Sequence, residues 1–424
     1  MCVLRHRCLC IGSLPNGGCM VMDPKTIRNQ IPSLKGDSPI YLDNACVTLR
    51  PQSVIDAVTR YYEQEPSCGG RSAHRWGMAV TRTEHAARDG ISRLVGAKGP
   101  DEVVFTRNAT HSINAVAHGT KWEKGDVVVI TDKEHNSNSI PWRMQEGVDV
   151  RVARTNDDGR FDLEDFETIC ADAGDSLRMV AIGHTRNLDG TSTPAKECAK
   201  IAHDHGAQIL LDAAQSVPHQ VVDMQEIEAD FLVFSIHKMM GPSGMGALVA
   251  SEDAFNGLKS IAAGGQTVSK STIDDFVFKP GRGHLEGGLG HYAGYYGTAA
   301  AVDFLNDLSM EKIHEHEVKI NRIISDGVRG LDGASIIGPD SPSERGGITS
   351  ILLDGRDPHQ IAIMLDEGFG IYARSGLHCV DPWFHANGAL NGSLRFSAYA
   401  YNTIEEAKQT VDAMDELFTA IPRT

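Results

Sequence analysis

The sequence predicts an α/β protein: a large domain with a mostly parallel sheet flanked by helices, and a smaller α+β domain at the C-terminal end. Between residue 38 and about residue 301, short β-rich runs alternate with longer amphipathic runs, and Gly, Asp or Asn separates them. That alternation is typical of a parallel sheet with helical crossovers. Several of the β-rich runs are apolar nearly throughout, as expected of parallel strands buried on both faces.

The elements of the large domain follow from these runs. Residues 192–206 predict a helix, because Ser, Thr and Pro stand at its start and Gly206 at its end. Two further helices are predicted near 297–309 and 311–331. Six runs are predicted to be strands: 101–106, 126–131, 178–185, 207–214, 229–237 and 246–251.

The pattern changes after the second of these helices. The later runs are typical of an α+β domain with antiparallel strands, and they cover 348–355, 359–368, 370–376, 392–401 and 403–421. We therefore predict a large domain over 23–305, including the N-terminal segment, and a small domain over 306–424. Residues 1–22 are expected to be a disordered extension, or an over-long start with Met20 or Met22 as the true first residue.

The charge balance excludes some classes of partner. The 424 residues include 40 Lys and Arg against 56 Asp and Glu, a formal net charge of −16. A surface of that sign repels nucleic acid and anionic membranes, so we expect neither as a partner. No run approaches the roughly 18 to 20 apolar residues that a membrane span requires. A local basic pocket for a small anion is compatible with this charge.

Four of the nine cysteines lie in the first 22 residues. That segment lacks the apolar run and cleavage site of a signal peptide. Its CLC run with His6 is a weak zinc candidate, since no second ligand pair follows, and we expect no metal site. The other five cysteines are scattered and form no CxxC pair, which suits a reducing cytosol. We therefore expect a cytoplasmic protein.

A lysine and an aspartate follow two of the predicted strands. Lys238 comes after a buried strand and before a Gly/Pro-rich loop, and Asp212 ends the preceding strand. Both face the carboxyl edge of the sheet, where open α/β sheets bind ligands. A buried carboxylate needs a cationic partner, and a protonated pyridine nitrogen is one. This pair is what a pyridoxal phosphate enzyme needs, with the lysine to form the Schiff base.

Several segments resemble the class V aminotransferases, which are fold-type I pyridoxal phosphate enzymes. The segments LDAAQSVPH and FSIHKMMGPSGMG resemble their cofactor signature, and similar stretches occur at 41–51, 104–117 and 134–142. Near the C-terminus, RSGLHC (374–379) and SLRFSAYAYNT (393–403) resemble motifs of group II cysteine desulfurases and selenocysteine lyases. Those two segments favour that branch over ordinary transaminases.

The resemblance implies roles for individual residues. Lys238 is the Schiff-base lysine, Asp212 pairs with the ring nitrogen, and Gln215 contacts the phenolic oxygen. His135 stacks on the ring and relays protons, and Asn187 touches the cofactor or the substrate. The phosphate ligands implied are Thr110, the amide of His111, Ser235 and His237, which fits the affinity of hydroxyl groups and helix N-termini for a dianion.

Cys379 bears on the type of reaction. Cys170 and Cys198 lie on predicted helices and are expected to be small buried apolar residues. Cys379 instead lies in a Gly-containing loop beside Arg374 and His378, surroundings that favour an exposed, reactive thiolate. Arg395 can bind a substrate carboxylate through its planar guanidinium. Arg374 and Asn187 are the other expected substrate-binding residues.

The resemblance thus implies a cysteine desulfurase that converts L-cysteine to L-alanine and leaves a persulfide on Cys379. A sulfur-acceptor protein or a reductant must then remove the sulfur for iron–sulfur cluster or other sulfur biosynthesis. The resemblance also implies a homodimer with sites near the interface.

The chain departs from the family pattern at four positions. Leu289 stands where the family has a threonine that reaches the partner's phosphate, Ala109 replaces a hydroxyl, Leu377 replaces a histidine, and Arg186 adds a cation. Another class V reaction is therefore an alternative, whether aminotransferase, epimerase, selenocysteine lyase or other C–S lyase, with Cys379 incidental. A non-enzymatic interaction protein is disfavoured because both Lys238 and Asp212 are present.

Overall fold

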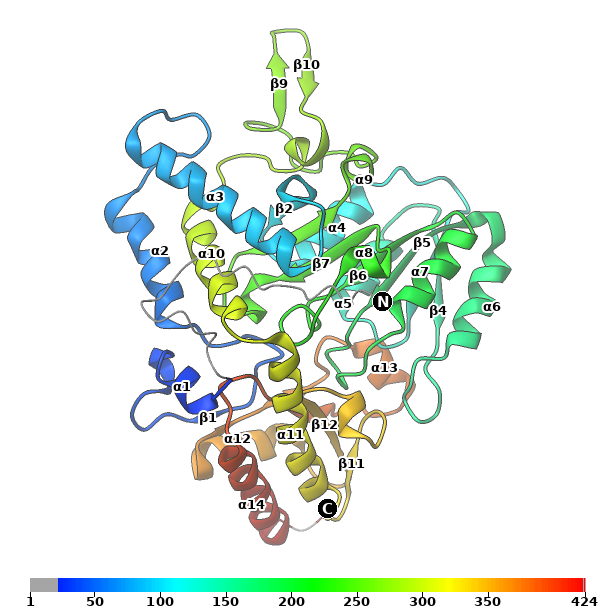
Figure 1. Cartoon of the computed structure of the whole chain (residues 1–424). Helices are drawn as coiled ribbons and strands as arrows, with labels where there is room; N and C mark the ends of the chain where they lie inside the picture. Colours follow the sequence, from blue (N-terminus) through cyan, green and yellow to red (C-terminus); the bar gives the residue numbers. More distant parts are fainter. Residues whose placement is uncertain (1–21, 422, 424) are drawn as a thin grey trace, which may run out of the picture.

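The computed structural model describes residues 22–421 and 423, and its centre is a seven-stranded sheet (Figure 1). The strand order is β2-β8-β7-β6-β5-β3-β4, and all neighbours are parallel except for β8, which runs antiparallel to β2 and β7. The strands are β2 (Val103–Thr106), β3 (Val127–Thr131), β4 (Asp149–Ala153), β5 (Leu177–Gly183), β6 (Gln208–Asp212), β7 (Phe231–Ser235) and β8 (Gly246–Ala250).

All six predicted strands are present, and the sheet is mostly parallel as expected. The sequence analysis missed β4, in which Asp149 and Arg151 interrupt the apolar pattern. An edge strand exposes more of its length than a central one, so it carries less of the apolar signal.

Helices cover both faces of the large sheet, and the strands alternate their side chains between two cores. Val127 and Val129 of β3 pack into one core, and Val128 and Ile130 pack into the other. The first face is covered mainly by α3 (Arg75–Leu94), α6 (Leu163–Ala173), α7 (Ala195–Asp204), α8 (Met224–Ile227) and α10 (Tyr292–Asn306). The second is covered by α4 (Ala109–Gly119), α5 (Asn136–Arg143) and α9 (Glu252–Asn256).

The C-terminal part contains a four-stranded antiparallel sheet, in agreement with the predicted α+β pattern. Its order is β11-β12-β15-β14, with β11 (Ala334–Ile336), β12 (Ile348–Leu353), β14 (Arg374–Gly376) and β15 (Ser393–Ser397). Residues of α11 (Met310–Val328), α12 (Pro358–Phe369) and α14 (Ile404–Ala420) form the core beneath it. The predicted domain boundary at residue 305 falls at the end of α10 and stays a prediction.

The N-terminal segment lies on the small sheet's side of the molecule. β1 (Ile40–Tyr41) pairs in parallel with β13 (Ile371–Tyr372), and Leu42 belongs to the core of the C-terminal part. The Asn44 side chain donates a hydrogen bond to the Ser397 carbonyl at 2.7 Å. These contacts place the residues after Asn44 between the two sheets.

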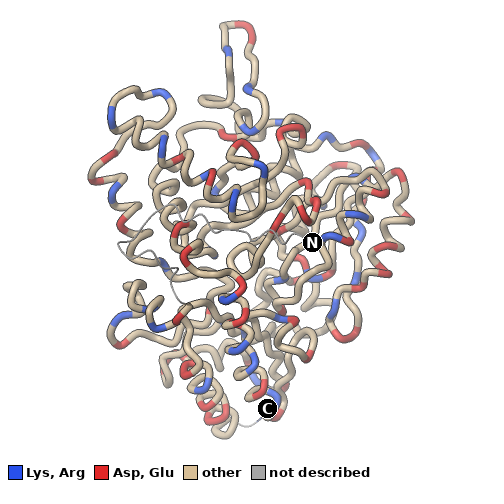
Figure 2. The backbone as a smooth tube through the Cα atoms, in the orientation of Figure 1, with Lys and Arg blue, Asp and Glu red and all other residues tan. Residues whose placement is uncertain are grey.

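The remaining elements lie at the periphery. They are α1 (Pro24–Arg28), α2 (Gln52–Gln64), α13 (Asp381–Ala386), β9 (Val268–Ser271) and β10 (Phe276–Phe278). β9 and β10 form a hairpin that projects from the body at the top of Figure 1. Acidic and basic residues are interspersed along most of the chain (Figure 2).

The expected extension over residues 1–22 lies outside the described residues except for Met22, and so do the alternative start at Met20 and the CLC zinc candidate. Within residues 22–421 and 423, no helix combines the length and apolar character needed to cross a bilayer.

A buried ion pair ties α3 to the segment before α10. Arg88 is 1% exposed, and its Nη1 and Nη2 atoms donate to the two carboxylate oxygens of Glu286 at 2.8 and 2.7 Å. Glu286 also accepts from the Phe105 amide of β2 at 2.6 Å. Because Arg88 is buried, removing Glu286 from this bidentate pair would leave a desolvated charge that is poorly compensated.

We expect Glu286→Leu to lower the free energy of unfolding by about 3 kcal/mol, because the buried Arg88 guanidinium loses its bidentate partner and keeps the ionic contact with Glu84 Oε1 at 3.0 Å. Denaturant unfolding followed by circular dichroism measures this change. The double variant Arg88→Met/Glu286→Leu removes both charges and is expected to recover most of the loss. Arg93→Ala, which breaks an exposed pair with Asp89, is the control and should cost less than about 1 kcal/mol. If Glu286→Leu were as stable as Arg93→Ala, the result would contradict the prediction.

Candidate active site

The carboxyl ends of three neighbouring parallel strands bring the predicted residues together. Asp212 ends β6, Lys238 follows β7 in a short 3₁₀ turn, and Asn187 lies in the loop after β5. They border a cleft of about 210 Å³ that also receives side chains from β14, β15 and the loop containing Cys379. The predicted residues that line it are Thr110, His135, Asn187, Asp212, Gln215, Ser235, His237, Lys238, Arg374, Cys379 and Arg395.

Lys238 and Asp212 interact electrostatically across the floor of the cleft. Burial lowers the pKa of Lys238, and the negative charge of Asp212 opposes that shift. Burial raises the pKa of Asp212, which the Lys238 charge and a 3.0 Å hydrogen bond from the Ala214 amide oppose. Each charge therefore favours the charged form of the other, whereas burial opposes both. A neutral lysine amine is accessible here at a lower pH than in solution.

One end of the cleft is formed by the N-terminus of α4. Thr110 Oγ1 lies 2.7 Å from Ser137 Oγ, and Ser235 Oγ accepts from the Ala109 amide at 2.9 Å. The His111 amide donates to the Asn108 side chain at 2.9 Å, and His111 is not among the residues that line the cleft. The N-cap side chain uses this amide here, and the implied role of His111 as a phosphate ligand stays a prediction.

His135 begins α5 and is held as a neutral ring. Its Nδ1 accepts a hydrogen bond from the Ser137 amide at 3.0 Å. Burial, with the charges of Lys238 and Arg395, lowers the pKa of His135 to about 4. Burial and Lys238 likewise lower the pKa of His237 to about 4. The positive charge of the cleft is thus carried by lysine and arginine.

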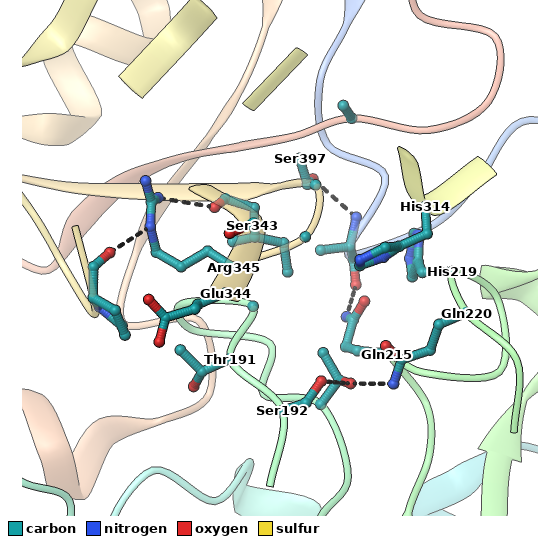
Figure 3. A pocket seen from close by; sticks show the side chains of 18 of the residues that line it. Thr191, Ser192, Gln215, His219, Gln220, His314, Ser343, Glu344, Arg345 and Ser397 are labelled. Atoms are coloured by element: carbon teal, nitrogen blue, oxygen red, sulfur yellow. Dashed lines mark hydrogen bonds between the residues drawn. The ribbon is translucent and has the colours of Figure 1, made fainter. Parts of the chain in front are cut away.

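Gln215 lines both this cleft and a second cavity of about 400 Å³, and Figure 3 shows it among the residues of the second cavity. Its Nε2 donates to the Ala45 carbonyl at 2.7 Å, and the Ala45 amide donates to Ser397 Oγ at 2.9 Å. Its Oε1 is buried and has no hydrogen-bond partner among the described residues. The amide of Gln215 is therefore fixed in position, with one polar atom left to a bound group.

Arg395 of β15 is 2% exposed and lies on the side of the cleft that the small sheet forms. Its Nη1 donates to the Asn187 carbonyl at 2.9 Å, and its Nη2 lies 3.5 Å from Asp43 Oδ1. Its Nε has no hydrogen-bond partner among the described residues. A buried guanidinium with an unused N–H is suited to an anionic group such as a carboxylate.

Cys379 is exposed at the opening of the cleft, on a tightly anchored loop. The His378 carbonyl accepts from Asn187 Nδ2 at 2.8 Å, and the Cys379 carbonyl accepts from the Asn136 amide at 2.7 Å. Burial, with Arg395 and Arg374, lowers the pKa of His378 to about 2, so this ring gives the thiol no positive charge. The sequence suggested that His378 would favour a thiolate at Cys379, but the structure holds His378 as a neutral ring.

Sequence reasoning gave no role to several residues that line the cleft. Ser137 pairs with Thr110, and its position within the first turn of α5 was the available signal. Glu134 is buried among Thr131, Asn138 and the Gly183 amide, and burial raises its pKa to about 7. Cys46 also lines the cleft, and so does Arg186, the additional cation that the departure from the family pattern indicated. Leu289, the expected departure from the family, is 71% exposed.

Comparison with known proteins identifies the family. The model of the class-V aminotransferases matches residues 40–410, and the chain belongs to this family. A cysteine desulfurase of Haloferax volcanii is 36% identical over 389 residues, covering 89% of this chain and 90% of that protein. A probable cysteine desulfurase of Methanothermobacter thermautotrophicus is 37% identical over 402 residues, covering 93% and 98%.

A solved structure agrees with the sequence relatives. The apo structure of a cysteine desulfurase from Thermococcus onnurineus NA1 superposes with a TM-score of 0.89 at 31% identity. The match covers 94% of this chain and 98% of that one. The expected fold, a large mostly parallel sheet with a smaller α+β part, is confirmed.

His184, just after β5, provides a pH test of the site's surroundings. Burial lowers the pKa of His184 to about 4 from 6.5, so the unfolded state binds more protons between those values. Its contribution to stability is full above pH 6.5 and is lost as pH falls toward 4, by at most about 3 kcal/mol. We expect His184→Asn to flatten the dependence of the unfolding midpoint on pH over this window. Identical slopes for the two proteins would refute this expectation.

Proposed function

We propose that this protein is a pyridoxal phosphate-dependent cysteine desulfurase. It removes sulfur from L-cysteine, releases L-alanine and holds the sulfur as a persulfide on Cys379. One observation carries the proposal: a single cleft joins the Lys238 and Asp212 pair to an exposed thiol and to the buried guanidinium of Arg395. The relatives named cysteine desulfurase support it over 90% and 98% of their lengths.

The residues present fit pyridoxal phosphate. Asp212 supplies a buried carboxylate for a protonated ring nitrogen, and the unpartnered Gln215 Oε1 leaves a polar atom for a ring substituent that carries a proton. Hydroxyl groups of Thr110 and Ser235, at the N-terminus of α4, suit a phosphate dianion. His135 supplies a neutral ring surface. When bound, the cofactor provides an electron sink for negative charge at the substrate's α-carbon.

Residues of this chain bind the substrate and transfer its protons. Arg395 binds the substrate carboxylate, and Asn187 holds both Arg395 and the Cys379 loop in place. Lys238, whose pKa burial lowers, takes the proton from the α-carbon and returns a proton later. Asp212 keeps its negative charge beside the protonated ring nitrogen with which it would pair.

Cys379 receives the sulfur. Its Sγ attacks the substrate's sulfur atom, an S–S bond forms and the C–S bond of the substrate breaks. The electrons of that bond stay with the carbon, which takes a proton and leaves as alanine. The sum is cysteine plus the Cys379 thiol giving alanine plus a Cys379 persulfide, so no external oxidant is needed. A sulfur-acceptor protein or reductant then clears the persulfide from the exposed position.

A cytoplasmic location is part of this proposal. The five cysteines of the described residues are all free thiols, which a reducing compartment preserves. A persulfide carrier works only where thiols stay reduced.

Replacing Cys379 tests the reaction. We expect Cys379→Ala to reduce sulfide release from L-cysteine by about 100-fold or more, because the sulfur has lost its nucleophile. The absorbance change on mixing the holoenzyme with L-cysteine should persist, since Lys238 and Asp212 remain. Lys238→Ala should abolish both signals. Cys68→Ala, at an exposed thiol outside the cleft, is the control with unchanged sulfide release.

Sulfide and alanine are measured together under reductant. If Cys379→Ala still releases both at the wild-type rate, Cys379 is not the nucleophile and another C–S lyase reaction applies. If the holoenzyme absorbs in the visible but releases no sulfide, the substrate is another amino acid.

A homodimer is the second part of the proposal, and the β9–β10 hairpin supports it. Ile273 at its tip is fully exposed, and Phe276 and Val277 are more than half exposed. Leu289, in the segment after the hairpin, is also exposed. Adjacent apolar side chains on a projecting hairpin are typical of a surface that another chain covers. A second copy is the partner that the family resemblance implies.

We expect the protein to have twice the mass of one chain by size-exclusion chromatography with light scattering. Ile273→Asp/Phe276→Asp should shift it toward the monomer, because the charges oppose burial of the hairpin. Ile363→Asp, at a comparably apolar exposed position on α12, is the matched control and should stay dimeric. A wild-type monomer with full activity would overturn the dimer proposal.

A further inference from the structure

A second thiol lines the same cleft as Cys379. Cys46 is half-buried and belongs to the segment that runs between the two sheets. The backbone just before it is fixed at Ala45, whose carbonyl accepts from Gln215 and whose amide donates to Ser397. The Cys46 amide donates to the Asp43 carbonyl at 3.2 Å. The position of this thiol in the cleft is therefore set by the surrounding structure.

Cationic side chains lie around Cys46. Arg374 Nη1 donates to Cys46 Sγ at 3.4 Å, so the guanidinium that sequence reasoning placed beside Cys379 contacts the other thiol. Arg395 lies close enough for a charge on Cys46 to affect its ionisation. A charge on Cys46 or on Cys379 also raises the pKa of Lys238, so both sulfurs lie near one ammonium group.

The other described cysteines lack this setting. Burial raises the pKa of the Cys170 thiol to about 12 and also raises that of Cys198, which keeps both protonated and unreactive. Cys68 is exposed and is not among the residues that line the cleft. Among the cysteines that the structure describes, Cys46 and Cys379 share the cleft.

We propose that Cys46 is a second sulfur carrier, which takes the outer sulfur atom from the Cys379 persulfide. This inference rests on the proposed desulfurase function. The Cys46 thiolate attacks the outer sulfur of the persulfide, a new S–S bond forms on Cys46, and the old S–S bond breaks. Cys379 leaves as a thiolate, and the proton on the outer sulfur travels with it. One S–S bond replaces another, so the step needs no oxidant or reductant.

The relay changes what one subunit can hold. Cys379 is exposed, whereas the Cys46 sulfur is partly covered and receives a hydrogen bond from Arg374. After transfer, Cys379 is free to accept sulfur from a second cysteine while the first atom is stored deeper in the cleft. The enzyme then carries two sulfur atoms per subunit before an acceptor arrives.

The stoichiometry of the first turnovers tests the relay. The holoenzyme, loaded with pyridoxal phosphate, is mixed with L-cysteine without reductant and quenched rapidly, and alanine per subunit is counted. Persulfides are alkylated and located by peptide mass spectrometry. We expect two alanines per wild-type subunit, with one extra sulfur on each of Cys46 and Cys379.

Cys46→Ser keeps a polar partner for Arg374 but cannot carry a sulfane sulfur, so its burst should fall to one alanine with sulfur on Cys379 alone. Cys46→Ala should behave in the same way, which separates sulfur transfer from the hydrogen bond. Cys68→Ser is the matched control and should keep the burst at two.

Other outcomes overturn the inference in distinguishable ways. A wild-type burst of one, with sulfur confined to Cys379, refutes the relay and leaves the desulfurase function standing. A burst of two with both sulfur atoms on Cys379, unchanged in Cys46→Ser, also refutes it, because the second atom then extends a chain on Cys379. No alanine from any of the proteins refutes the desulfurase function and the relay with it.

Discussion

The cleft depends on a few hydrogen bonds that hold the loop after β5 against the small sheet. The Asn187 carbonyl accepts from Arg395 and its side chain donates to the His378 carbonyl, while the Leu188 carbonyl accepts from Ser350 Oγ. These groups are buried, so an unmade bond here would cost the full desolvation of its partner. Two neighbouring residues thus fix the guanidinium, the thiol loop and the carboxyl edge of the large sheet relative to one another.

That arrangement produces a local charge opposite to the charge of the whole chain. The protein has a formal net charge of −16, yet its cleft contains Lys238, Arg374 and Arg395. The histidines add no positive charge, because burial holds the pKa of His135 near 4. Asp43, beside both arginines, has a raised pKa because it is buried. Net charge describes distant steering, whereas the groups lining the cleft decide which anion binds.

The sequence predicted the parts of this site that follow from where each parallel strand ends. Strand ends follow from apolar runs, so it could place Asp212 and Lys238 at one edge and recover six of the seven strands. It could not predict hydrogen-bond partners that come from distant segments. Arg395 donates to the Asn187 carbonyl, 208 positions away in the chain, and Arg374 contacts Cys46, 328 positions away. Such contacts depend on the packing of one sheet against the other, and local patterns do not encode that packing.

The backbone at Cys379 explains how an exposed thiol can still be held in one position. His378 and Cys379 both have positive φ angles, 51° and 59°, a conformation that costs a non-glycine residue about 1–3 kcal/mol. The conformation is kept because the loop's two carbonyl groups accept hydrogen bonds from Asn187 and Asn136. The thiol is therefore presented to solvent by a backbone that has little freedom to swing. In the proposed reaction, sulfur therefore passes from the substrate in the cleft to an acceptor outside it without a large movement of this loop.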